Sequence, residues 1–120
     1  MKTYYRIEAA FEVTKGFLKT ERVFVKEFNT GNLLQDKINA EEFYSEGLGS
    51  IMMDESFAEE DGIELKLSPY GLSLDFIAVD PIEGEFVYCL AGYNQPEEVI
   101  AESKFIESQF LKGKDNIKLS

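Results

Sequence analysis

Apolar and polar residues alternate along several parts of the chain, and the grouping of these parts constrains the fold most. Between Tyr4 and Val13 every second residue is apolar, and the same period returns in 63–68 and 72–79. A period of two is typical of a strand with one buried face. Strands that follow one another without an intervening helix favour an antiparallel sheet.

Turn residues divide these strands. Thr14-Lys15-Gly16 separates the first strand from a β-rich run over 17–28, which predicts an N-terminal hairpin. Ser68-Pro69-Tyr70-Gly71 has the residue preferences of a type I turn, and 80–84 is a second turn signal. With a last strand over 85–93, these turns predict a three-stranded meander.

Two segments have helical spacing instead. The first, Leu33–Tyr44, contains Asn39 and Glu42 at capping distance, which leaves open whether it forms one helix or two. The clearer helix is expected over Asn94–Lys112, with an asparagine cap, a proline in the first turn and early carboxylates. Its apolar stripe is expected to face the core, with Glu107 among the residues on the other side.

These elements predict a single α+β domain over 1–120. The antiparallel sheet is expected to have about five strands, the N-terminal hairpin plus the meander, with the two main helices packed on one face. Residues 50–61 are expected to form a loop or a frayed turn, and the tail 113–120 either stays flexible or adds a short strand. The hairpin strands are expected at a sheet edge, where two copies can pair.

The single cysteine, Cys89, excludes an internal disulfide. It lies in an apolar run, and the sequence has no Lys or Arg between Lys66 and Lys104, which favours a buried thiol over a reactive one. No apolar stretch approaches the ~20 residues that cross a bilayer. Glu8 and Glu12 interrupt any signal-peptide core, so a reducing cytoplasm is the expected compartment.

Charge is unevenly distributed along the chain. The net charge is −11, and residues 38–103 hold sixteen acidic side chains and one basic one, Lys66. Such a charge repels phosphates, which argues against direct binding of nucleic acid or of an anionic membrane. The acidic middle is either a solvated face that keeps the protein in solution or a landing site for a basic protein.

The hypothesis of a landing site selects a set of partner-binding residues. Acidic residues are densest between Glu41 and Glu64. Phe57 and Tyr70 lie near them in expected loops, where aromatic side chains are favoured as interface anchors. The predicted set is Glu41, Glu42, Glu46, Asp54, Glu55, Phe57, Glu59, Glu60, Asp61, Glu64 and Tyr70.

Catalytic groups are scarce in the sequence. It has no histidine, which removes the commonest general base and most zinc and iron ligand sets. Glu64-Leu65-Lys66, with Asp54 or Asp61 upstream, faintly resembles the acid and Glu-x-Lys pattern of metal-dependent nucleases, but so short a pattern is common by chance. Residues 54–61 lack the ligand spacing of a calcium loop. We therefore predict no enzyme activity, no cofactor and no metal site.

In size, acidity and lack of a catalytic set, the chain is similar to toxin immunity proteins and to phage-encoded inhibitors of restriction or CRISPR systems. The similarity lies in composition and covers no motif. It implies a non-enzymatic inhibitor that binds a basic nuclease or nucleic-acid-binding protein, in the manner of a nucleic-acid mimic. The alternatives are a structural or adaptor protein, such as a homodimer whose acidity serves only solubility, and, well behind, a small enzyme that uses carboxylates.

Overall fold

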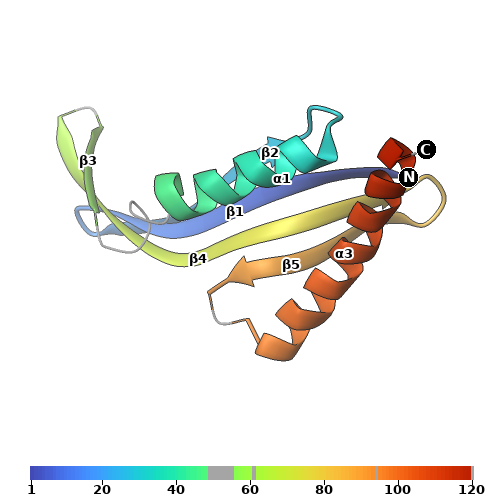
Figure 1. Ribbon diagram of the computed structural model, residues 1–120. Coiled ribbons are helices and arrows are strands. Elements are labelled where there is room, and N and C mark those ends of the chain that lie inside the picture. Colours follow the sequence, from blue (N-terminus) through green and yellow to red (C-terminus); the bar gives the residue numbers. More distant parts are fainter. Residues whose placement is uncertain (49–55, 61, 94, 120) are drawn as a thin grey trace.

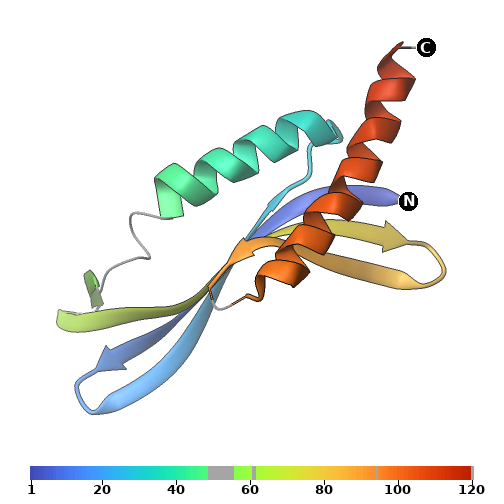
Figure 2. The ribbon, with the colours of Figure 1, turned by 60° about the horizontal axis from the view of Figure 1, so that its bottom comes forward.

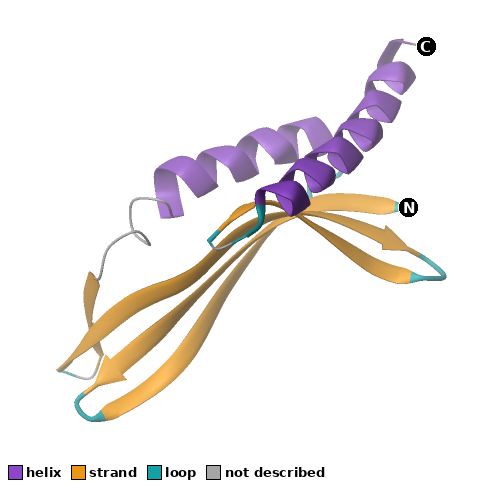
Figure 3. Ribbon diagram, turned by 90° about the horizontal axis from the view of Figure 1, so that it is seen from below, coloured by secondary structure: helices purple, strands orange, loops and turns teal. Residues whose placement is uncertain are grey.

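The structure, a computed structural model, describes residues 1–48, 56–60, 62–93 and 95–119, with side chains for all of them except 47–48, 56–60 and 113–119. Within these ranges the chain forms a five-stranded antiparallel sheet and two α-helices (Figure 1). Both helices lie on the same face of the sheet, as Figure 3 shows, and none of the described residues forms a helix over the other face. The predicted α+β class is confirmed.

The first hairpin forms as predicted. β1 (Lys2–Lys15) and β2 (Leu18–Phe28) pair antiparallel from Tyr5 opposite Phe28 to Lys15 opposite Leu18, without a register shift. Gly16 in the two-residue connection has a φ of 60°, a value that residues with a side chain rarely adopt.

The longest strand, β4 (Ile63–Asp80), corrects the predicted meander. A turn was expected at 68–71, but the strand runs through it. Its pairing with β1 shifts there, because Ala10 pairs with Gly71 and Phe11 with Pro69, which leaves Tyr70 as the extra residue of a β-bulge. A bulge accommodates a proline, which cannot donate to the ladder. One strand therefore replaces the first two strands of the meander.

Two strands pair with the edge of β4 that faces away from β1. β3 (Ser56–Glu60) pairs with the beginning of β4, and β5 (Gly84–Gly92) pairs with its end. The order across the sheet is thus β2-β1-β4, followed by β3 and β5. β3 corrects the loop predicted for 50–61, of which 50–55 and 61 lie outside the described residues. Gly62, with a φ of 77°, belongs to an Asp-Gly dipeptide that is typical of hairpin turns.

The first helical segment is continuous. α1 (Leu33–Glu42) begins after Asn32, whose side chain accepts a hydrogen bond from the Gln35 N–H. It passes directly into η1, a π-helical turn over Phe43–Leu48. Asn39 lies inside α1 and accepts a hydrogen bond from the Gln35 side chain, so of the two alternatives the single segment is observed.

The second helix, α3 (Glu97–Leu119), is longer than predicted. The Pro96 carbonyl accepts hydrogen bonds from the Val99 and Ile100 N–H groups, so the helix begins beside the proline as expected. The predicted asparagine cap at 94 lies outside the described residues. The helix continues past Lys112 because one glycine, at 113, disfavours a helix by only about 1 kcal/mol.

The core lies between these helices and the sheet face beneath them. It contains Tyr5, Ile7, Ala9, Leu33, Ala40, Leu72, Leu74, Phe76 and Leu90. We call this the inner face and the opposite face of the sheet the open face. The molecule is elongated, with extents of 59 × 28 × 27 Å and a radius of gyration of 17.0 Å, against about 14 Å for a compact chain of this length. Figures 1 and 2 show the reason, since the β1–β2 and β3–β4 hairpins extend past the end of the helical segment.

Candidate functional site

The acidic stretch of the sequence lies at one end of the molecule. Nine carboxylates and no basic side chain occur between Glu41 and Glu64. Figures 1 and 2 both place the end of α1, with η1, and the β3–β4 hairpin at the same end of the structure. The C-terminal end of a helix adds partial negative charge there. We call the described acids of this region the acidic end; they are Glu41, Glu42, Glu46, Glu59, Glu60 and Glu64.

The acidic residues of the acidic end belong to both the helical layer and the sheet. Glu41, Glu42 and Glu46 are exposed on the helical segment, whereas Glu64 is exposed on the open face of β4. Glu59 stands directly opposite Glu64 in the β3–β4 ladder. Two acidic residues therefore occupy one cross-strand position of this ladder.

The other predicted partner-binding residues are placed less completely. Phe57 and Glu60 belong to β3, of which the structure describes the backbone, and Phe57 pairs with Lys66. Tyr70 is 48% exposed at the bulge of β4, close to the carboxylates of Glu12 and Glu21. Three further residues of the set lie outside the described residues, namely Asp54, Glu55 and Asp61.

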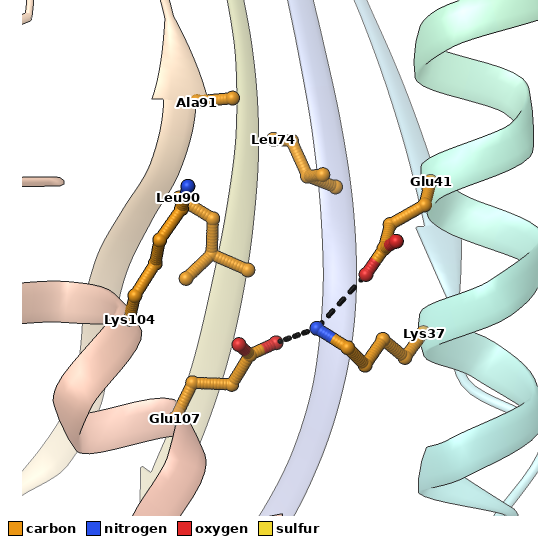
Figure 4. Close-up of a pocket in the computed structure, with 7 residues that line it drawn as sticks. All are labelled: Lys37, Glu41, Leu74, Leu90, Ala91, Lys104 and Glu107. Carbon is orange, nitrogen blue, oxygen red and sulfur yellow. Dashed lines mark hydrogen bonds and ion pairs between the residues drawn. The ribbon is translucent and has the colours of Figure 1, made fainter. Parts of the chain in front are cut away.

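A pocket between the helices is the second candidate site. A cavity of about 390 Å³ lies between α1 and α3 over the inner face (Figure 4). Its apolar lining comes from Leu74, Leu90 and Ala91, and its charged lining from Lys37 and Glu41 on α1 and Lys104 and Glu107 on α3. Its volume is within the range of small-molecule sites, about 300–1,000 Å³.

Glu107 is the centre of a hydrogen-bond network at this pocket. Its Oε2 accepts hydrogen bonds from the Tyr5 hydroxyl at 2.6 Å and from Lys37 Nζ at 2.9 Å. Lys37 Nζ also lies 2.8 Å from Glu41 Oε1. Glu107 is 5% exposed and Tyr5 is fully buried. Because a buried carboxylate is strongly destabilising without partners, these contacts make the network a structural link between α1, β1 and α3.

The network also determines the protonation of its members. Burial, then the hydrogen bond to Glu107, raises the pKa of Tyr5 well above its ordinary range, so Tyr5 remains a donor. Burial alone would lower the pKa of Lys37, but its hydrogen bonds with Glu41 and Glu107 outweigh burial and raise it. Tyr5 and Lys37 are thus fixed as donors to the carboxylates, and the pocket's polar groups are engaged mainly with one another.

A further cluster lies on the open face. Arg6 Nη1 donates to Glu85 Oε1 at 3.0 Å, and its Nε lies 3.8 Å from Glu8 Oε1. Asp75, 4% exposed, accepts a hydrogen bond from the Ser73 hydroxyl at 3.2 Å, and burial raises its pKa. Burial, then the neighbouring Asp75, also raises the pKa of the Cys89 thiol, which disfavours the reactive thiolate.

Among the residues that the structure describes, no group of three or more Cys, Asp or Glu side chains could hold a metal ion. No helix in the described part of the chain has the length and apolar character required to cross a membrane. Glu64 and Lys66 do lie on one face of β4, as the nuclease-like pattern requires, but Asp54 and Asp61 lie outside the described residues.

Compared with protein-family models, with curated proteins and with solved structures, the chain gives no match.

Sequence reasoning missed the pocket network. Glu107 was expected on the polar side of its helix, and the structure places it on the buried side instead. A signal was present, because Glu107 follows Ile100 by seven residues and precedes Phe110 by three, so it falls on the same helix face as these two apolar residues. A carboxylate within an apolar stripe predicts a buried partner, but the sequence does not say that the partner is Tyr5, 102 residues away.

Proposed function

We propose that this protein is a non-enzymatic binding protein that recognises a basic protein through its acidic end. One observation carries the proposal. The stretch with nine carboxylates and no basic side chain has its described parts gathered at one end of an elongated molecule. Charges of one sign that gather in space create a potential that attracts a basic surface and speeds its encounter.

The chemistry of the partner follows from this charge. A basic surface that normally holds phosphates is complementary to a dense set of carboxylates, so a nuclease toxin, a restriction or CRISPR effector or a repressor is the expected class. By occupying that surface, the protein would act as an inhibitor and a nucleic-acid mimic. The exposed carboxylates of Glu42, Glu46 and Glu64 are the groups that a Lys or Arg of the partner would contact.

A pair of matched variants tests the proposal. The first replaces Glu42, Glu46 and Glu64 by glutamine at the acidic end, and Glu41 is kept because it pairs with Lys37. The control replaces Glu97, Glu98 and Glu102 on α3, so both variants change the net charge from −11 to −8. The measurement is the retention of basic proteins from a host lysate on each immobilised variant, at low and at physiological ionic strength.

We expect the wild type and the α3 variant to retain one basic nuclease or nucleic-acid-binding protein, more strongly at low salt. The acidic-end variant should lose it. Equal retention by both variants would contradict the proposal and favour the alternative of an adaptor whose acidity serves only solubility.

A further inference from the structure

Among the residues that the structure describes, no strand lies beside the outer edge of β2. β2 is the first strand in the sheet order and forms its edge (Figure 2). It spans 11 residues, and all of them are exposed except Phe28, which is half-buried. The opposite edge of the sheet is divided between β3 and β5. A long, regular and exposed edge strand is a template for another strand, unless it is covered or interrupted.

The geometry of the hairpin determines which N–H and C=O groups of β2 point away from β1. Lys15 and Leu18 flank a two-residue connection and form the last pair of the ladder, so they are a hydrogen-bonded pair across the turn. Hydrogen-bonded and non-bonded pairs alternate along an antiparallel ladder. The N–H and C=O groups directed away from β1 are therefore those of Lys19, Glu21, Val23, Val25 and Glu27.

We infer that two copies of the chain pair antiparallel through β2, about a two-fold axis at Val23. In this register the five residues with outward peptide groups face one another, which gives about ten hydrogen bonds between the copies. The register also uses the whole length of the strand. The facing residues are Leu18 and Phe28, Lys19 and Glu27, Thr20 and Lys26, Glu21 and Val25, and Arg22 and Phe24.

Charge selects this register over its neighbours. Two Lys19–Glu27 pairs form by symmetry, and no like charges face each other. If the two-fold axis moves by one residue to Arg22, the strands slip by two residues and Arg22 faces Arg22. A slip in the other direction places Glu21 opposite Glu27 and Arg22 opposite Lys26, and like charges directly opposite are destabilising. β2 itself has three basic and two acidic side chains in a chain of net charge −11, so repulsion between the copies is weak here.

The same register covers an exposed apolar tip. Leu18, at the tip of the hairpin, is 71% exposed, although it is a large apolar residue. Phe28 packs against Phe43, with ring centroids 5.8 Å apart, and Phe24 stacks on the same ring at 6.3 Å. Leu18 of one copy would lie beside Phe28 of the second copy, so each hairpin tip would meet the aromatic cluster of the other.

A charge-swap series tests the dimer, which does not depend on the proposed basic partner. The variants are Lys19→Glu, Glu27→Lys and the double variant, with Lys104→Glu on α3 as the control for net charge. The measurement is the molar mass in solution by sedimentation equilibrium over a range of protein concentrations. Circular dichroism verifies that each variant is folded.

The wild type and the Lys104→Glu variant should be dimers. Each single variant at position 19 or 27 creates two like-charge pairs, and its dimer should dissociate at about tenfold higher concentration. The double variant should recover the wild-type affinity. Within one chain Lys19 lies 3.6 Å from Glu12, and Glu27 stands opposite Arg6 in the β1–β2 ladder, so the swap repairs no contact inside the chain. Recovery can therefore arise only between copies.

Two results would overturn the inference. The first is a monomeric wild type at every concentration. The second is a dimer that neither single variant weakens, because its interface would then lie elsewhere. Val23→Pro provides a second test, since it removes one outward N–H group at the two-fold axis. A folded Val23→Pro variant that dimerises as tightly as the wild type would also exclude β2 pairing.

Discussion

Removal of the Tyr5 hydroxyl tests the network that joins the two helices to the sheet. In Tyr5→Phe the ring is kept, together with its contact to Phe76, whose centroid lies 5.4 Å away. The change removes only the 2.6 Å hydrogen bond that the Tyr5 hydroxyl donates to Glu107 Oε2. The Tyr5 side chain is fully buried. Glu107 keeps the hydrogen bond from Lys37.

The expected loss in the free energy of unfolding follows from the chemistry of that hydrogen bond. Hydrogen bonds to charged groups contribute about 1.5–3 kcal/mol in proteins. Because Lys37 still neutralises Glu107, we expect the free energy of unfolding to fall by about 2 kcal/mol rather than by the larger penalty of an unpaired buried charge. Tyr88→Phe is the matched control, since the Tyr88 ring also stacks on Phe76, with centroids 6.1 Å apart, but lies outside the network.

Urea titrations followed by circular dichroism measure both variants. The midpoint for Tyr5→Phe should fall by about 1 M, with an unchanged slope, while Tyr88→Phe should stay near the wild type. A double-mutant cycle with Glu107→Gln should give a coupling energy of about 1–2 kcal/mol. A coupling energy near zero would refute the reasoning, because the hydroxyl and the carboxylate would then contribute to stability independently.

Three further predictions concern single residues. Gly62→Ala should lower the free energy of unfolding by about 1 kcal/mol, because Gly62 has a φ of 77°, whereas Gly71→Ala should change it little; urea titration compares the two. Burial raises the pKa of Tyr5 above its ordinary value of 10.0. Its stabilising contribution is therefore complete below pH 10 and decreases at higher pH by about 1.4 kcal/mol per unit, so Tyr5→Phe should flatten the alkaline stability profile. Burial and Asp75 raise the pKa of Cys89, so alkylation by iodoacetamide at pH 8 should be slower than for a free thiol, and Asp75→Asn should accelerate it; equal rates would contradict this.

Residue alternation, turn residues and helix-start residues predicted the elements whose structure depends mainly on neighbouring residues in the sequence. Alternation and a glycine turn suffice for the first hairpin, and helical spacing and the proline at 96 suffice for the two helices. The turn predicted at 68–71 was wrong because β1 pairs along nearly the whole of β4 and holds both halves as one strand. The ladder outweighs the local preference of Pro69, and the bulge absorbs the difference.

β3 was missed for a related reason. Its sequence ends in Glu59 and Glu60, which disfavour a strand, and only the pairing with β4 makes it one. The Asp-Gly dipeptide at 61–62 was the available signal. The acidic residues themselves could be selected from the sequence, but their gathering at one end depends on how far the hairpins extend past α1, which no local pattern encodes.

The shared edge of β4 has a consequence for its amide protons. Leu72 and Phe76, near one end of the strand, belong to the core beneath the helices, whereas the beginning of β4 pairs with the five-residue β3 and extends past the helical segment. Amide exchange through local opening depends on the contacts that must be broken with each hydrogen bond. The amides near Phe76 should exchange only through global unfolding, and those near Ile63 through opening of the terminal hairpin alone. One continuous strand thus belongs to two cooperative units, with the boundary expected near the bulge at Tyr70.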